Sequence, residues 1–527
     1  MRKLKNIPDD FFDIKVYNQI SFIIIESLNS AFEECDHLLK NTGHSKYQNL
    51  VAVFYHHLTR LITSYLFCVY EIRLSGISKT EELDNLILKG KDNRTWPINY
   101  NSVFDDRFII TKRSNNIRKL IILIRQQLKC QFFMLFNRAT IMNKGNTINV
   151  LFEPGLAMIL KMITVLKSKK LTVRFYNKER KIFIPEYEKQ KIILLKSVKN
   201  TETRLREIWS TQFEYGEGFL KFLIMELENY VSYAKKEKIK ANAVIVPSLS
   251  GLHNRLLAAQ AKSQGLPVIS LFHGDSVGTT DEPGWGPVLQ TFCDMSLGYG
   301  EYGCKQLQKG HYNKGLFENP LIIPGSSAVV KKLYTNTKVK RITEFSNSTI
   351  MYVPNVFGGT NRYGPFNYIH DIAYLSWQEN MLEFVLKLMH PKRLIRKAYP
   401  GGIKYSFKIN EIETIYDTNL VNVLDEADIL IYDTPTTAFN FGAATSKPII
   451  YFDIGIRNLM PDALESIKER CIYVKGSPKK AEKMVTKAFE GRNKILNNSY
   501  TTRYCLSKNP KLREEILVDM IENLVVC

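Results

Sequence analysis

The sequence has few cysteines, and no two of them stand close enough to form a paired metal-binding motif. Eight cysteines are scattered between positions 35 and 527 without a Cys-x-x-Cys pair. A zinc ribbon, an iron–sulfur site or a secreted disulfide scaffold would need closely spaced cysteines. An Asp-x-Asp metal motif is absent too. We therefore expect reduced thiols, no bound metal ion and no other cofactor.

Long apolar runs are also missing. Met1-Arg2-Lys3-Leu4-Lys5 is followed by polar and acidic residues instead of the apolar segment of a secretory signal. The best candidate for a membrane span, residues 120–136, is broken by charged and polar side chains. It does not reach the roughly 18 apolar residues that a spanning helix needs. The sequence therefore predicts a soluble, cytoplasmic protein.

Positive charge is in excess and is concentrated in one region. Lys and Arg number 73 against 52 Asp and Glu, and residues 161–200 hold twelve Lys or Arg against three Glu. Such a region is either a solvated face of the fold or a surface that docks on an anionic membrane. No nucleic-acid-reading motif is present, so we do not expect a nucleic-acid partner.

The order of apolar segments predicts an α/β protein with a helical extension at the N-terminus. Residues 1–140 show helical periodicity, mainly over 22–39 and 50–72. Further along, an apolar strand at 243–247, a helix starting at Leu252 and a second strand at 267–272 make a βαβ unit. Such units build parallel sheets that helices cover on both faces.

A second region of the same kind follows a linker expected at residues 326–347. Its expected strands are residues 350–353, 393–395, 429–432, 448–452 and 471–474. A charged connector is expected before a helix at 218–234. The simplest organisation is a helical region (1–140), two Rossmann-like domains (141–335 and 336–510) facing one another across a cleft, and a C-terminal helix (511–527).

Ligands of open parallel sheets bind beyond the carboxyl ends of strands, so the residues that follow each strand deserve inspection. His273 follows one strand, Gly274 lets the backbone pass close to a ligand, and Asp275 could orient the imidazole. The segment 272–276 is thus a candidate for acid–base catalysis. The alternative is a histidine that is only hydrogen-bonded at a strand end.

Two further segments could bind an anionic group. His390-Pro391 stands among cations that include Lys387 and Arg393, which could hold a phosphate or be basic residues at a helix C-terminus. Asp433 ends an apolar strand, and Thr436 and Thr437 open the next helix. Free backbone N–H groups and hydroxyls there suit a nucleotide phosphate, although the threonines could simply cap the helix. No Walker motif and no G-x-G-x-x-G follows a strand, which disfavours ATPases and dehydrogenases.

In chain order, the segments 272–276, 387–391 and 433–437 resemble bacterial GT-B transferases of surface-polymer synthesis. The nearest likenesses are teichoic-acid glycerophosphotransferases and capsule transferases that use cytidine-activated sialic or Kdo-type sugars. The resemblance covers roughly residues 240–455, and it implies a metal-independent enzyme with a GT-B fold. It implies a catalytic role for His273, assisted by Asp275. It also implies a set of donor-binding residues: Lys387, His390, Asp433, Thr436 and Thr437.

The function expected from this resemblance is transfer of a sugar from a nucleotide-activated donor, cytidine-linked, to a glycan or lipid-linked acceptor. The pathway would be capsule or lipopolysaccharide synthesis, at the inner face of the membrane. Three alternatives stay open: a CDP-glycerol-type glycerophosphotransferase, a nucleotide-sugar 2-epimerase, and a non-catalytic sugar-nucleotide-binding scaffold.

Overall fold

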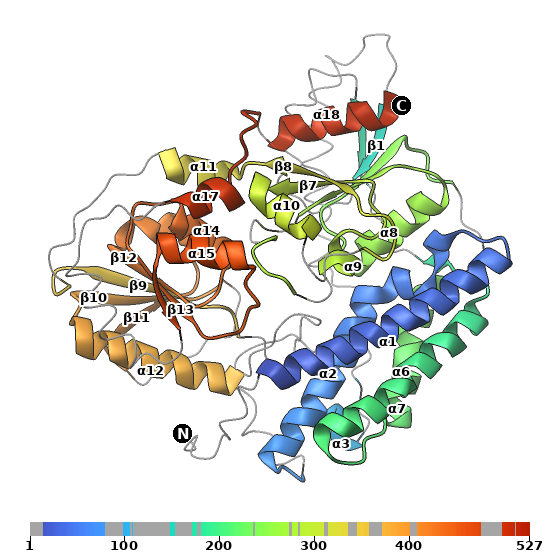
Figure 1. Cartoon of the computed structure of the whole chain (residues 1–527), viewed down its shortest axis with the longest axis horizontal. Coiled ribbons are helices and arrows are strands. Elements are labelled where there is room, and N and C mark those ends of the chain that lie inside the picture. Colours follow the sequence, from blue (N-terminus) through green and yellow to red (C-terminus); the bar gives the residue numbers. More distant parts are fainter. Residues whose placement is uncertain are drawn as a thin grey trace.

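The chain folds into two parallel β-sheets beside a helical unit (Figure 1). The computed structural model describes residues 14–79, 98–105, 108, 148–152, 171–175, 181–234, 238–309, 315–335, 345–357, 371–400, 407, 409–475, 498–511 and 513–526, apart from 273, 275, 276, 283 and 284. The segment 120–136, residues 161–170 and 176–180 of the basic region, and both His273 and Asp275 lie outside the described residues.

The helical unit is built from two distant parts of the chain. Its long helices are α1 (Ile14–Asn41), α2 (Leu50–Ser75), α6 (Tyr187–Trp209) and α7 (Glu217–Glu228). The smaller elements in or beside it are η2 (Lys46–Gln48), α3 (Asn101–Asp105) and a two-stranded parallel pair, β3 (Ile182–Phe183) and β4 (Val231–Ser232). α2 lies at the centre, and Asn49 caps it by accepting hydrogen bonds from the backbone N–H groups of Val51 and Ala52.

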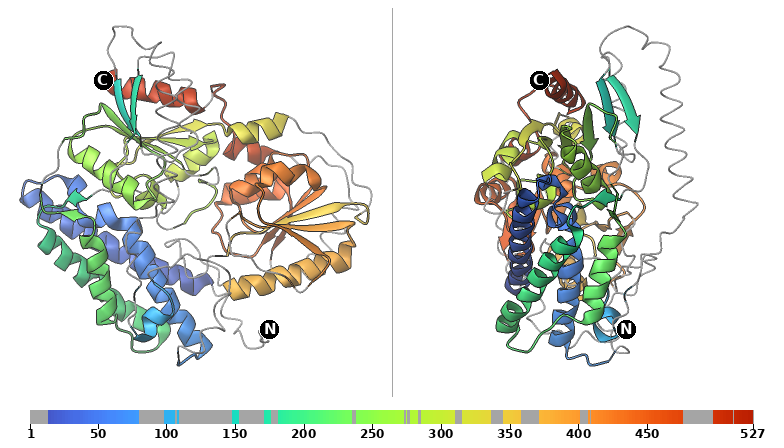
Figure 2. Two further views of the ribbon diagram at one scale, coloured as in Figure 1. Left: turned by 180° about the vertical axis from the view of Figure 1, so that it is seen from behind. Right: turned by 90° about the vertical axis from the view of Figure 1, so that its right-hand side faces the viewer.

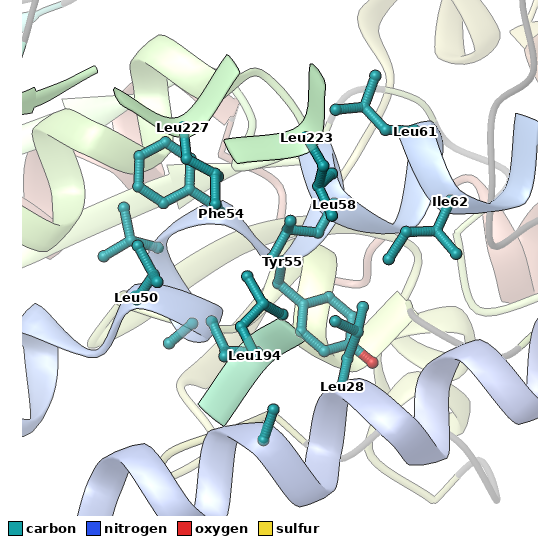
Figure 3. Close-up of a cluster of buried hydrophobic side chains, with 14 of the residues drawn as sticks. Leu28, Leu50, Phe54, Tyr55, Leu58, Leu61, Ile62, Leu194, Leu223 and Leu227 are labelled. Carbon is teal, nitrogen blue, oxygen red and sulfur yellow. The ribbon is translucent and has the colours of Figure 1, made fainter. Parts of the chain in front are cut away.

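Apolar side chains from all four long helices meet around α2. Figure 3 shows Leu28 of α1, Phe54 and Tyr55 of α2, Leu194 of α6 and Leu223 of α7 in one buried cluster. The expected helices at 22–39 and 50–72 are thus present in α1 and α2. Helix α6 corrects one expectation, because it occupies the segment predicted to be a charged connector.

The first sheet contains six parallel strands in the order β2-β1-β5-β6-β7-β8. The strands are β1 (Ile148–Phe152), β2 (Leu171–Phe175), β5 (Ala243–Val246), β6 (Val268–Leu271), β7 (Met295–Tyr299) and β8 (Leu321–Gly325). Its helices are α8 (Leu252–Ser263), α9 (Trp285–Leu289) and α10 (Glu301–Lys309). The predicted βαβ unit is present as β5, α8 and β6, and α8 packs on α2 of the helical unit.

The second sheet also contains six parallel strands, in the order β11-β10-β9-β12-β13-β14. The strands are β9 (Thr349–Val353), β10 (Arg393–Lys397), β11 (Ile412–Ile415), β12 (Ile429–Tyr432), β13 (Ile449–Asp453) and β14 (Ile472–Lys475). Its helices are α12 (Asp371–Met389), α13 (Leu420–Val423), η4 (Leu424–Glu426), α14 (Thr437–Ala443) and α15 (Pro461–Arg470). Numbered along the sheet's own sequence, the order is 3-2-1-4-5-6, that of the dinucleotide-binding Rossmann fold.

Helices cover both faces of the second sheet, as expected for a parallel sheet. Along β9, Ile350 and Tyr352 point into the core beneath α12, whereas Met351 and Val353 point into the core beneath α14 and α15. This alternation follows from the two-residue period of a strand. It explains why the strand is apolar without interruption.

The chain passes between the two sheet domains twice. α11 (Ala328–Thr335) lies within the expected linker 326–347 and contacts α14 of the second domain. After α17 (Ser499–Tyr504), the chain returns and α18 (Arg513–Val526) packs on the first sheet. Arg513 secures this return, because its Nη2 donates to the carbonyl of Leu297 in β7 at 2.9 Å.

The predicted fold class is confirmed: two Rossmann-like α/β domains stand side by side, with the helical unit against the first (Figure 2). Among the helices of the described part of the chain, none combines the length and apolar character needed to cross a bilayer.

Candidate functional site

The carboxyl edge of the second sheet has a topological switch point between β9 and β12. These central strands pair with each other, while their connections lead to opposite halves of the sheet. In sheets of this order, ligands bind in the crevice outside the strand ends at this point. Asp433 comes directly after β12 and therefore lies at this edge.

The carboxylate of Asp433 is buried and accepts three hydrogen bonds from hydroxyl groups. Its Oδ2 accepts from Tyr352 at 2.5 Å and from Tyr374 at 2.6 Å, and its Oδ1 accepts from Thr434 at 2.9 Å. Only 1% of Asp433 is exposed. Burial raises the pKa of Asp433, although the hydroxyl donors oppose the shift. The carboxylate thus joins β9, α12 and β12 and does not present a free charge to a ligand.

This hydrogen-bond network also fixes the backbone that follows β9. The hydroxyl of Tyr374 accepts a hydrogen bond from the backbone N–H of Asn355 at 2.7 Å while it donates to Asp433. Burial raises the pKa of both Tyr352 and Tyr374, so both hydroxyls keep their protons and act as donors to Asp433. The two loops that border the switch point are therefore held together by one buried carboxylate.

Thr436 and Thr437 stand where the turn after β12 enters α14. Thr436 is the N-cap residue with extended backbone (φ −108°, ψ 176°), but its side chain makes no capping hydrogen bond. The alternative in which its hydroxyl only caps the helix therefore does not describe this structure. Both threonines are half-buried.

Gly274 of the first domain lies against Thr437 of the second. A Cβ added to Gly274 would come within 2.6 Å of the Thr437 Oγ1, closer than real Cβ contacts allow. Glycine allows this approach without a rotation of the Thr437 side chain. The structure thus brings together two of the three segments singled out in the sequence, one from each domain. Gly274 is flanked by His273 and Asp275, which lie outside the described residues.

The third segment lies elsewhere. Lys387 is in the last turn of α12, is largely exposed and pairs with Glu383 at 3.6 Å. His390 follows the helix with a positive φ of 40°, and the chain then enters β10. Because His390 precedes its strand, it lies at the amino edge of the sheet, opposite to Asp433 and Thr437. The structure does not bring Lys387 and His390 to the switch point.

Arg393, the cation expected to assist this segment, is already paired. It begins β10 next to Thr349, the first residue of β9. Its guanidinium donates to Glu413 at 2.7 Å and to Glu426 at 2.8 Å. Arg393 therefore lies at the edge opposite to the switch point, and its charge is already paired with two carboxylates.

The sequence pattern did not predict that residues after 395 reach the carboxyl edge of the sheet. The strand ends at Lys397 and not at residue 395, so Tyr399 comes just beyond the sheet and is 61% exposed. Arg396, at the end of the strand, is buried, donates through Nε to Gln378 at 3.0 Å and stacks on Phe407. Arg396 and Lys397 make the end of β10 look polar in the sequence, so the strand was expected to end at residue 395.

No protein-family model matches the chain, and no curated protein sequence matches it significantly. Solved structures that align with this chain include the UDP-GlcNAc 2-epimerase from Neisseria meningitidis bound to UDP-GlcNAc. It is 10% identical, with a TM-score of 0.35, and the alignment covers 72% of this chain and 100% of that chain. The glycosyltransferase of kitacinnamycin is 11% identical, with a TM-score of 0.38 over 73% and 100% of the two chains. The wall teichoic acid polymerase TagF is 10% identical, with a TM-score of 0.36 over 79% and 99%. At such low identity, the activity has to be inferred from the chain's own residues.

Proposed function

We propose that this chain is a metal-independent glycosyltransferase that moves a sugar from a nucleotide-activated donor, cytidine-linked, to a glycan or lipid-linked acceptor. The observation that supports this most is the contact between Gly274 of the first domain and Thr437 of the second. A transferase with two substrates needs groups from two sides to converge on one reacting bond. This contact is where the two domains could supply them.

The second domain would bind the donor at its switch point. The hydroxyls of Thr436 and Thr437 are at this edge and would donate hydrogen bonds to phosphate oxygens. Asp433 would act indirectly, because its carboxylate holds the loops after β9 and β12 in place. Lys387 and His390 are left out of the proposed donor site because they lie at the opposite edge of the sheet.

The first domain would bind the acceptor and supply the base. His273 would take the proton of an acceptor hydroxyl while that oxygen bonds to the anomeric carbon of the donor sugar. The bond between the anomeric carbon and the phosphate oxygen would break, and the nucleotide would leave with the bonding electron pair. Asp275 would orient the imidazole and raise its basicity. Exclusion of water between the domains would limit hydrolysis of the donor.

The proposed setting is capsule or lipopolysaccharide synthesis at the inner face of the membrane. The basic region 161–200 would then dock on anionic lipid. Its described part includes α6, where Lys189 pairs with Glu186 at 2.8 Å and Lys191 with Glu188 at 2.5 Å. Docking would accordingly depend on basic residues of this region other than Lys189 and Lys191, whose charges are paired with glutamates.

The test replaces the proposed base. We expect His273→Ala to lower sugar transfer at least about 100-fold, the usual contribution of a general base, while nucleotide binding stays intact. His390→Ala is the matched control at the other edge of the sheet and should keep transfer near the wild-type rate. Transfer at the wild-type rate by His273→Ala would show that the base assignment is wrong.

The same assay separates the alternatives. Turnover of the donor without any acceptor would indicate a 2-epimerase, and incorporation of glycerol phosphate would indicate a glycerophosphotransferase. Donor binding without consumption in the presence of glycan acceptors would indicate a scaffold.

A further inference from the structure

A short segment of the first domain forms a strand-like pair with a segment of the second. We call residues 279–282 the strap and residues 457–460 its receiving segment. Thr280 and Leu459 form an antiparallel bridge. The backbone N–H of Asp281 donates to the carbonyl of Asn458 at 2.8 Å, and that of Met460 donates to the carbonyl of Thr279 at 3.0 Å. The two domains are thus joined by main-chain hydrogen bonds.

An ion pair closes the end of the strap. Glu282 is fully buried, and its Oε2 accepts from the Nη1 of Arg457 at 2.6 Å. The other carboxylate oxygen, Oε1, is buried and has no hydrogen-bond partner among the residues that the structure describes. A buried carboxylate is costly unless a cation compensates it, and Arg457 is the cation that contacts Glu282 here. The Arg457 side chain is partly exposed, so its guanidinium could turn into solvent and stay hydrated if the ion pair broke.

The start of the strap is fixed to the first domain. Gly278 has a φ of +91°, and a Cβ there would lie 2.1 Å from the carbonyl oxygen of Gly303 in α10. This close packing ties the strap to α10. Only three residues separate Gly278 from Gly274, the glycine that contacts Thr437. The strap and the Gly274–Thr437 contact are therefore close along the chain and bridge the same two domains.

Further contacts would keep the domains together if the strap were released. Asp462, just after the receiving segment, accepts hydrogen bonds from Tyr302 and Gln306 of α10, both at 2.7 Å. Release would accordingly be a local change at the strap and not a separation of the domains.

We propose that the strap is a positioning element: the Glu282–Arg457 pair holds the two domains in the register that places Gly274 against Thr437. Without Arg457, the Glu282 side chain could stay buried only by taking up a proton; as a carboxylate it would have to reach water, and the strap would then leave its receiving segment. The link between the domains stands on the contacts described above. Its consequence for catalysis rests on the proposed transferase function.

The direct test is hydrogen exchange at the two amides that cross the interface, Asp281 and Met460, in the full-length protein. Both should be protected in the wild type, and Arg457→Met should lose both protections together, with exchange at least about tenfold faster. The double variant Glu282→Gln/Arg457→Met no longer buries an uncompensated charge and should regain most of the protection. Arg204→Met removes an exposed ion pair with Glu26 and is the matched control, which should change neither amide.

Unprotected amides in the wild type would show that the strap does not form. Full protection retained in Arg457→Met would show that the Glu282–Arg457 pair does not hold it. Equal loss in the single and double variants would overturn the role of the buried charge. These outcomes need no substrate, so they are independent of whether the transferase assignment holds.

A kinetic measurement tests positioning. Arg457→Met should lower the turnover number at least about tenfold while leaving the nucleotide dissociation constant within about twofold, and Arg457→Lys should recover part of the loss. If exchange protection were lost with no change in turnover, the strap would link the domains without positioning the site.

Discussion

At the scale of single residues, Asp433 shows how a buried charge can organise a site without touching a ligand. A buried carboxylate is tolerated where hydrogen bonds compensate it, and three hydroxyl groups do so here. The residues that donate belong to β9, α12 and the turn after β12. Asp433 therefore determines the shape of the proposed donor site.

We predict that Asp433→Ala destabilises the protein by about 3 kcal/mol, because the buried hydroxyls of Tyr352 and Tyr374 lose their acceptor. Asp433→Asn should be tolerated to within about 1 kcal/mol, since the amide oxygen can accept from both tyrosines and the NH₂ group can donate to Thr434. Urea unfolding measures both. A loss of about 3 kcal/mol in Asp433→Asn would show that the negative charge itself is required.

The raised pKa of Asp433 adds a pH dependence. In the folded state the group binds its proton more readily than at its ordinary pKa of 3.8. The stability that protonation contributes is fully present below the ordinary pKa and is lost as pH rises through the raised pKa of the folded state. The wild type should therefore gain stability relative to Asp433→Asn as pH falls from neutral toward 3.8. A gap between the two proteins that moves in the opposite direction would contradict the raised pKa.

The sequence identified the right position for Asp433 but not its role. A carboxylate after an apolar strand is equally compatible with a ligand contact and with a buried network. The tyrosines that decide between the two lie 81 and 59 residues away in the sequence. His390 precedes the expected strand 393–395, which already placed it at the amino edge, yet the resemblance implied a donor-binding role for it. Residues before a strand and after it reach opposite edges of the sheet.

At the scale of elements, a single arginine joins the helical unit to the first domain. Arg255 of α8 is fully buried, and its guanidinium donates to four backbone carbonyls. Two acceptors, Ala52 and Val53, belong to α2, and the other two, Pro287 and Val288, belong to α9. Burial lowers the pKa of Arg255 to about 9, so the guanidinium is still charged at neutral pH.

Arg255→Met should therefore cost at least about 3 kcal/mol, because four buried carbonyls lose a shared donor. The exposed Arg204→Met variant is the control and should stay within about 0.5 kcal/mol of the wild type. Thermal unfolding compares the two. A loss as small as that of the control would mean that α2 and α9 are held by apolar packing alone.

The long N-terminal helices and the central strands could be predicted from local pattern, whereas other elements, among them β7, β8, β11, α6 and α12, were not predicted. Strands buried on both faces, such as β5, β9 and β12, are apolar throughout and were found. β8 was missed because Pro324 and Gly325 look like strand breakers, yet an edge strand tolerates proline since one side makes no ladder hydrogen bonds. α6 was missed because its buried face includes Gln190, Ser197 and Thr201, which interrupt the apolar period.

At the scale of the whole molecule, the arrangement depends on contacts between parts far apart in the chain. Gly274 meets Thr437, the strap meets residues 457–460, and α18 returns to the first sheet. Sequence patterns indicate two parallel sheets, but not which loops of the two domains touch. The proposed function depends on that choice, since it requires the segment 272–276 and the segment 433–437 at one place.

The measurement that tests this account most directly is nucleotide binding, read as thermal stabilisation by CMP, CDP, UDP and GDP. A nucleotide present at 100 times its dissociation constant should stabilise the wild type by about 2.7 kcal/mol, and we expect a cytidine nucleotide to do so. Thr437→Val, which replaces the hydroxyl with a methyl group, should lose most of this stabilisation, whereas Lys387→Ala and His390→Ala should keep it. No stabilisation by any of the four, or stabilisation that survives in Thr437→Val and disappears in Lys387→Ala, would contradict the proposed donor site.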